Sequence, residues 1–197
     1  MTPRTLFPVI VSTLLLYACT NDPLPDANSR PTPLHFGLYV TADPEHNPID
    51  PPERFTGFHS ATDFEILPGE EDADVPVTAI CDGPIRYSGF AEGYGGLIVQ
   101  TCSYKGEPVS VLYGHLTIET LPPVDTVAHK GDRLSTLAPA HSHDSDQNRK
   151  HLHLGIHRGA QPVFLGYVQT EDELKEFLDP QDVMDELGPA ENSMPKQ

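Results

Sequence analysis

The chain has 197 residues, of which 38% are hydrophobic and 21 are prolines, and its 12 Lys and Arg against 29 Asp and Glu give a formal net charge of −17. A charge of this sign argues against a nucleic-acid backbone or an anionic membrane surface as the main partner. The length and apolar content predict one globular domain, and the prolines predict many loops and few long helices.

Residues 1–18 are typical of a secretory signal peptide. Arg4 precedes an apolar run over residues 6–16, which is too short to span a membrane. The run ends in "LYAC" (16–19), which resembles a bacterial lipobox and predicts lipidation of Cys19. The alternative is an ordinary signal peptidase site nearby. Both readings predict export to the cell envelope or periplasm, and the first predicts membrane contact only through an N-terminal lipid anchor.

Residues 19–53 hold the lipidation site and a proline-rich segment. Its first part, to about Pro33, predicts an extended tether. A short strand over His35–Thr41 is expected to follow and to dock on the domain. Neither His35 nor His46 is expected to have a chemical role.

The domain proper is predicted over residues 54–190, followed by a tail over 191–197. Runs rich in β-branched and aromatic residues, separated by Gly or Pro, predict antiparallel strands over 75–81, 84–90, 96–102 and 108–116. Residues 171–178 and 180–187 predict helices, the first with Thr170 and Glu173 as a capping box. The expected fold is mostly β, a single antiparallel β-sheet domain with short C-terminal helices.

Cys81 and Cys102 flank a predicted hairpin. Their midpoint lies inside the turn "FAEGYGG" (90–96), so an antiparallel pairing brings the two close to opposite each other. In an oxidising compartment this predicts a disulfide, which would add about 3 kcal/mol in the chain-entropy model. The alternative is two unpaired core thiols.

The stretch "HLHLGIH" (151–157) places histidines inside an apolar strand. Side chains alternate faces along a strand, so His151 and His153 share one face while the leucines between them point into the core. Two adjacent imidazoles are costly to desolvate unless something binds them, and a metal would. His157 is expected to have no role.

Two other segments contain side chains that could belong to the same metal site. "FHSATDFEI" (58–66) offers His59 and Asp63, and "VLYGHLT" (111–117) places His115 after a glycine at a strand end. Catalytic zinc takes three ligands from His, Asp or Glu and leaves one position open. Alone, each segment has an ordinary alternative: a surface His with a turn Asp, or a structural His.

Together these motifs resemble the M23 peptidases, the lysostaphin-like or LytM zinc endopeptidases that cut peptide cross-links in bacterial cell walls. The resemblance runs from about Phe55 to Leu187 and rests on "HSATDF", "VPVTAICDGPIRYSGFAEGYGGLIVQ", "LYGHL", "KGDRL" and "HLHLGI". It implies the LytM/lysostaphin type of fold and one Zn²⁺ ion. It also implies zinc ligation by His59, Asp63 and His153, with His115 and His151 as the catalytic pair.

Two departures from the family pattern stand out. Ala61 replaces a glycine between the His and Asp of the first motif, and the polar "APAHSHDSDQNRK" (138–150) replaces a glycine-rich turn. The second departure bears on the groove for substrate more than on the metal. His141, His143, Asp144 and Asp146 could bind a second ion, but a solvated loop is the favoured reading.

The predicted function is a zinc-dependent endopeptidase acting on peptidoglycan peptides. Two neutral imidazoles and one carboxylate leave zinc a net positive charge, which lowers the pKa of bound water toward about 7. Hydrolysis also needs a base and a proton donor, for which His115 and His151 are available. The alternatives are a non-catalytic LytM-like regulator that activates other wall hydrolases, and a metal-scavenging lipoprotein suggested by "HSHDSD" (141–146).

Overall fold

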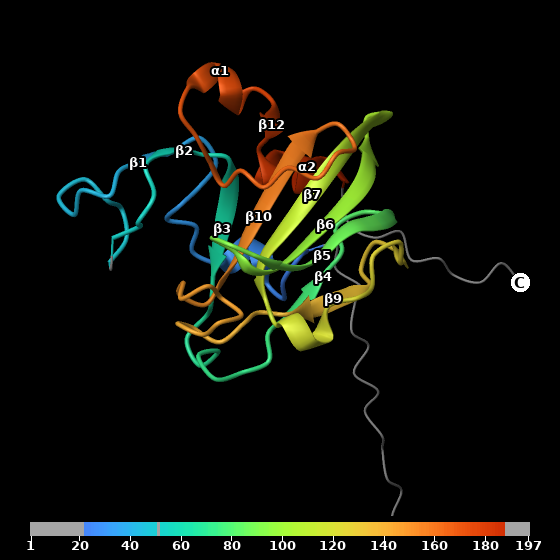
Figure 1. Cartoon of the computed structure of the whole chain (residues 1–197), viewed down its shortest axis with the longest axis horizontal. Coiled ribbons are helices and arrows are strands. Elements are labelled where there is room, and N and C mark those ends of the chain that lie inside the picture. The colour runs from blue at the N-terminus through green and yellow to red at the C-terminus, as the bar shows by residue number, and fades with distance from the viewer. Residues whose placement is uncertain (1–21, 51, 188–197) are drawn as a thin grey trace, which may run out of the picture.

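The structure, a computed structural model, describes residues 22–50 and 52–187 (Figure 1). The predicted signal peptide, Cys19 and the predicted tail lie outside these ranges. The strands are β1 (Tyr39–Val40), β2 (Gly57–His59), β3 (Ala61–Glu65), β4 (Pro76–Thr78), β5 (Gly83–Ala91), β6 (Gly95–Tyr104), β7 (Glu107–Leu116), β8 (Val127–Ala128), β9 (Arg133–Thr136), β10 (His151–Arg158), β11 (Tyr167–Val168) and β12 (Phe177–Leu178). The α-helices are α1 (Glu171–Leu174) and α2 (Pro180–Leu187), with short 3₁₀ turns at Ala27–Ser29 and Ile118–Thr120.

The predicted fold class is confirmed: the chain is mostly β, its strand pairs are antiparallel, and its helices are short. Within the described ranges, no helix combines the length and apolar character needed to cross a membrane.

A seven-stranded sheet organises the domain. Six of its strands run in the order β12-β10-β7-β6-β5-β8, and β3 pairs with the start of β10 (Figure 1). The β6–β7 hairpin turns at Lys105 and Gly106, both with positive φ (53° and 84°), as a tight two-residue turn requires. The sheet brings the start of β10 between β3 and the end of β7.

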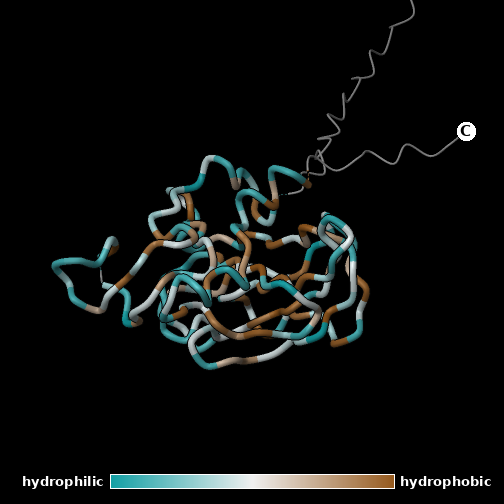
Figure 2. Tube along the Cα trace, turned by 90° about the horizontal axis from the view of Figure 1, so that it is seen from above, coloured by the Kyte–Doolittle hydropathy of each residue, from teal (hydrophilic) through white to brown (hydrophobic). Residues whose placement is uncertain are grey.

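The main core cluster lies on one face of this sheet, and a smaller cluster with Leu97, Val99 and Leu112 lies on the other. Alternation along β10 places Leu152, Leu154 and Ile156 in the main cluster, each fully buried. Val183 and Met184 of α2 pack against the same cluster. Figure 2 shows the hydrophobic stretches concentrated along the strands, with hydrophilic loops at the outside.

The N-terminal segment differs from the extended tether that its prolines predict. Leu24 and Ala27 are each 1% exposed and belong to the main core cluster, and Leu34 is fully buried. Arg30 is also buried and forms two hydrogen bonds to the Glu70 carboxylate, at 2.6 and 2.9 Å. From residue 22 onward the segment is therefore packed on the domain, because its few apolar side chains find places in the core.

Three predicted elements are shorter than expected. The strand predicted over 75–81 is reduced to β4, which pairs with β9. The strand predicted over 35–41 is reduced to β1, which pairs with β2. The helix predicted over 171–178 ends at Leu174, because Phe177 packs edge-on against the His157 ring at 4.9 Å and its strand β12 pairs with β10. The capping box of α1 is present as predicted, and α2 has its predicted bounds.

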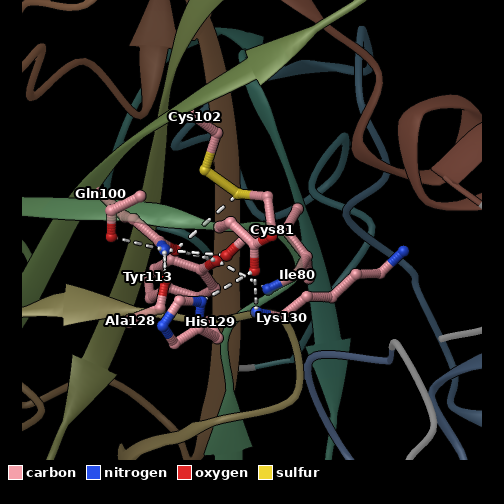
Figure 3. The surroundings of a disulfide bond; sticks show 10 residues. Ile80, Cys81, Gln100, Cys102, Tyr113, Ala128, His129 and Lys130 are labelled. Atoms are coloured by element: carbon pink, nitrogen blue, oxygen red, sulfur yellow. Dashed lines mark hydrogen bonds and ion pairs between the residues drawn. A yellow bond between two sulfur atoms is a disulfide. The ribbon is translucent and has the colours of Figure 1, made fainter. Parts of the chain in front are cut away.

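Cys81 and Cys102 form the expected disulfide, with a Cα–Cα distance of 6.1 Å (Figure 3). Beside it, the buried Gln100 Nε2 donates to the carbonyl oxygens of Cys81 (2.9 Å), Gly83 (3.2 Å) and Ala128 (3.2 Å). The Tyr113 hydroxyl donates to Gln100 Oε1 at 3.1 Å and accepts from the Ile80 amide at 3.0 Å. We call Gln100, Tyr113 and these partners the Gln100 cluster.

Candidate metal centre

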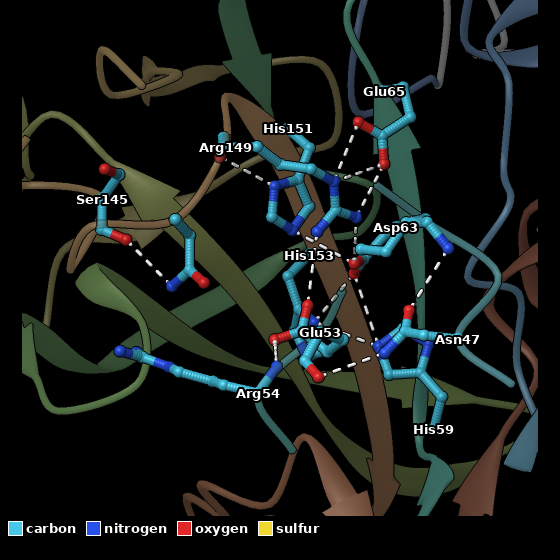
Figure 4. Close-up of polar contacts among 12 residues, drawn as sticks. Asn47, Glu53, Arg54, His59, Asp63, Glu65, Ser145, Arg149, His151 and His153 are labelled. Atoms are coloured by element: carbon cyan, nitrogen blue, oxygen red, sulfur yellow. Dashed lines mark hydrogen bonds and ion pairs between the residues drawn. The ribbon is translucent and has the colours of Figure 1, made fainter. Parts of the chain in front are cut away.

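Pairing of β3 with β10 builds the candidate metal centre. The register places Asp63 directly opposite His153, and His59 ends the adjoining strand β2 (Figure 4). Asp63 Oδ1 lies 2.9 Å from His153 Nδ1 and 3.4 Å from His59 Nε2, and the two ring nitrogens lie 3.3 Å apart. All three side chains are buried. The structure thus brings together the three residues for which the sequence predicts zinc ligation.

The spacing of these donor atoms fits zinc. Metal–ligand distances of about 2.0–2.1 Å in a tetrahedron place neighbouring ligand atoms about 3.3 Å apart. Among the described residues, this is the group of three or more His, Cys, Asp or Glu whose ligand atoms lie close enough to share an ion. Two nitrogens and one carboxylate oxygen are also a donor set that zinc prefers.

The protonation states suit a metal as well. Burial lowers the pKa of His153 to about 4, so the ring is neutral at neutral pH. Burial opposes ionisation of Asp63, but the interactions of its carboxyl with His151 and His59, together with hydrogen bonds to His151 and His153, hold the pKa of Asp63 well below the usual range. A neutral imidazole and an ionised carboxylate are the forms that bind metal ions.

His151 and His115 lie beside the three candidate ligands. His151 Nε2 is 3.1 Å from Asp63 Oδ2, and its Nδ1 donates to the Arg149 carbonyl oxygen at 2.9 Å. His115 is the next-to-last residue of β7 and has a φ of 64°, and its ring centroid lies 4.4 Å from that of His151. Burial, with a smaller effect from the neighbouring His151 ring, lowers the pKa of His115 well below its usual value.

A cavity of about 280 Å³ opens onto these side chains. Asp63, His115, His151 and His153 contribute to its lining, as does the segment around Gly166. A Cβ at position 166 would lie 3.1 Å from the Tyr94 hydroxyl oxygen and 3.3 Å from His153 Cε1. Glycine at this position therefore keeps the cavity open above the candidate ligands.

Sequence reasoning missed two residues at this site. The first is Tyr94, from the β5–β6 turn, which is 7% exposed and lies with its ring 5.3 Å from that of His153. Its buried hydroxyl has no hydrogen-bond partner among the described residues. Burial raises the pKa of Tyr94, so the hydroxyl keeps its proton at neutral pH. No pattern in the turn sequence distinguishes this tyrosine.

The second missed residue is Arg149, whose Nη2 lies 2.8 Å from Asp63 Oδ2. A signal for it was available, because Arg149 has the same strand parity as His151 and His153 and therefore the same face. Figure 4 shows its guanidinium directed toward Asp63 and Glu65.

The side chains of the polar segment 138–150 hold its shape and attach it to the rest of the domain. His141 Nδ1 donates to the Gln147 carbonyl oxygen, and His143 stacks on Phe90. Asp144 accepts from the Ile118 amide, and Asp146 pairs with Arg54. Within the part of the chain that the structure describes, these residues form no cluster of close metal-ligand atoms. His157 lies at the far end of β10, outside the candidate metal centre.

The chain matches no protein-family model and no curated protein. Its fold is similar to that of a chain in the SpoIIQ–SpoIIIAH pore-forming complex, with 11% identity over 85% of this chain and 91% of that chain and a TM-score of 0.54. A zinc-containing peptidase from Vibrio cholerae is 18% identical over 74% of this chain and 38% of that chain, with a TM-score of 0.48. Lysostaphin, an antimicrobial peptidase from Staphylococcus simulans, is 19% identical over 66% of this chain and 45% of that chain, with a TM-score of 0.46. The chain thus spans less than half the length of either peptidase.

Proposed function

We propose that this protein is a zinc-dependent endopeptidase that hydrolyses peptide cross-links of bacterial peptidoglycan. One observation carries the proposal: His59 Nε2, Asp63 Oδ1 and His153 Nδ1 have the mutual spacing of zinc ligands, and Asp63 and His153 line an open cavity together with two further histidines. The motif resemblance to the M23 peptidases supports the same assignment.

In this proposal, His59, Asp63 and His153 hold zinc, which would polarise a carbonyl and make a water more acidic. The Arg149 carbonyl oxygen can only accept, so His151 Nδ1 carries a proton, and Nε2, which lies 3.1 Å from Asp63 Oδ2, is the nitrogen left to exchange a proton with water or substrate. The Tyr94 hydroxyl and His115 line the same cavity. They are placed to donate hydrogen bonds to the developing oxyanion and a proton to the leaving amine.

The proposed substrate is an extended peptide of the cell wall. Cross-links that contain D-amino acids and diaminopimelate are the first candidate, and glycine-rich bridges are the second. The exposed Glu92 carboxylate at the cavity rim favours a substrate with a free amino group. An exported lipoprotein anchored through Cys19 would meet such a substrate in the cell envelope.

The test is digestion of purified sacculi by protein starting at Thr20, with and without a chelator, with released fragments identified by mass spectrometry. We expect chelator-sensitive release of cross-link fragments by the wild type and by His157→Ala, whose substitution lies on the same strand but outside the metal centre. His153→Ala should release none. If folded, zinc-loaded wild type released nothing, hydrolysis would be refuted and the non-catalytic regulator would be favoured.

A further inference from the structure

The Arg149 side chain bridges three carboxylates at the start of β10. Its Nη2 donates to Asp63 Oδ2 at 2.8 Å, and its Nε and Nη2 hold the Glu65 carboxylate at 2.9 and 2.7 Å (Figure 4). Its Nη1 lies 3.4 Å from Glu53 Oε2. The guanidinium is 20% exposed and the three carboxylates are no more than 18% exposed, so these are partly desolvated, charge-assisted contacts.

The two oxygens of Asp63 face different partners. Oδ1 faces the ring nitrogens of His59 and His153, where the proposed zinc would lie. Oδ2 faces Arg149 and His151 instead. Because Arg149 donates a hydrogen bond to Oδ2, Asp63 is limited to binding a metal through Oδ1 alone.

Glu65 is a potential competitor for the metal. It lies two residues after Asp63 on β3, so both side chains share one face of the strand. Asp63, Glu65 and Glu53 together bring three carboxylates to Arg149, which supplies one positive charge. The planar guanidinium has the geometry to contact several carboxylate oxygens at once. The guanidinium contacts both carboxylate oxygens of Glu65 and Oε2 of Glu53. These oxygens are therefore not available to a cation.

Arg149 is itself held firmly. The neighbouring Lys150 points to the opposite side, where its Nζ donates to the backbone oxygens of Glu70 (2.8 Å), Glu71 (3.2 Å) and Ala73 (2.6 Å). This contact fixes the start of β10 against the loop before β4. The Arg149 carbonyl then orients His151, while the Arg149 guanidinium orients Asp63.

We propose that Arg149 is a positioning residue that holds Asp63 in single-oxygen coordination and keeps Glu65 out of the metal shell. Arg149 acts through Asp63 and contacts neither metal nor substrate in this role. The inference rests on the proposed zinc site, and it concerns residue 149 of the segment that replaces the glycine-rich turn of the M23 pattern.

The test is the visible absorption of the Co²⁺-substituted full-length protein, because four-coordinate Co²⁺ absorbs much more strongly than five- or six-coordinate Co²⁺. In Arg149→Gln, we expect one Co²⁺ per chain but a several-fold weaker band, as Glu65 or the second oxygen of Asp63 joins the metal. The double variant Arg149→Gln with Glu65→Gln removes the competing carboxylate and should regain most of the intensity. Arg54→Gln, which removes an exposed arginine paired with Asp146, is the control and should leave the spectrum unchanged.

The outcomes separate the two proposals. If the wild type bound no Co²⁺, the metal centre itself would be refuted, and the role of Arg149 with it. An unchanged spectrum in Arg149→Gln would overturn the positioning role and leave the metal centre standing. A double variant as weak as the single variant would overturn the role of Arg149 in excluding Glu65.

Discussion

Two buried polar clusters in this protein differ in how fully their hydrogen-bonding groups are paired. In the Gln100 cluster, both ends of the Gln100 amide and the Tyr113 hydroxyl have partners within the protein. Around the candidate metal centre, His59 Nδ1, His115 Nδ1 and the Tyr94 hydroxyl are buried and have no partner among the described residues.

This difference indicates different roles. A buried polar group without a partner costs about 1–3 kcal/mol of stability. A protein is therefore expected to retain several such groups together only where a bound metal, substrate or water supplies their partners. The Gln100 cluster can be understood as structural, because it joins the disulfide region to the strands around it. The candidate metal centre is incomplete as protein alone, which is what a site for a metal and a substrate requires. The four predictions below test this contrast.

The largest effect is expected from the ligand histidines. His153→Ala should abolish both zinc binding and hydrolysis, because it removes one of three ligands. His151→Ala should abolish hydrolysis but leave much of the zinc. Bound zinc per chain and sacculus digestion measure the two effects, with His157→Ala as the control on the same strand. Equal zinc loss in both variants would contradict the division of roles.

Tyr94→Phe tests the unpaired hydroxyl. Loss of one donor to an oxyanion lowers the rate by about 100- to 1,000-fold, so we expect a fall of that size in the hydrolysis rate. Zinc content should not change, and the melting temperature should stay the same or rise slightly, because an unpaired buried hydroxyl is removed. A clear drop in melting temperature with full activity would show that this hydroxyl is structural.

Tyr113→Phe is the matched change in the Gln100 cluster. It removes a hydroxyl that pairs with both Ile80 and Gln100, and it should lower the free energy of unfolding by about 1–3 kcal/mol. Zinc content and activity of the folded variant should be unchanged. Denaturant unfolding in the presence of a chelator measures the stability without a contribution from metal.

The smallest effect is expected at Glu70, whose carboxylate belongs to neither cluster. Its hydrogen bonds from Arg30 lower the pKa of the Glu70 carboxyl below its usual value of 4.5. Because the folded-state pKa is the lower one, the ionised carboxylate stabilises the fold above about pH 4.5, and this is lost as the pH falls through the folded-state pKa. Glu70→Gln should therefore flatten the acid limb of a plot of the free energy of unfolding against pH. The expected loss of pH dependence is on the order of 1 kcal/mol. Parallel acid limbs would rule out this linkage.

The sequence predicted much of the sheet, because strand alternation is a local property. It placed His151 and His153 on one face and Leu152 and Leu154 in the core, as the structure has them. It missed the burial of Leu24 and Leu34, because proline content describes backbone stiffness and carries no information on distant packing partners. It missed Tyr94 for a related reason: the residue is distinguished only by its neighbours in space.

The packing of the N-terminal segment limits how far the domain could lie from a lipid attached to Cys19. Asp22 and Pro23 contact Thr78 through their backbone oxygens, and Asp22 follows Cys19 by three residues in the sequence. Three extended residues span at most about 11 Å. If Cys19 carries a lipid, as proposed, the domain would lie against the membrane surface, and the proposed hydrolysis would be restricted to the wall layer within one domain diameter of the lipid.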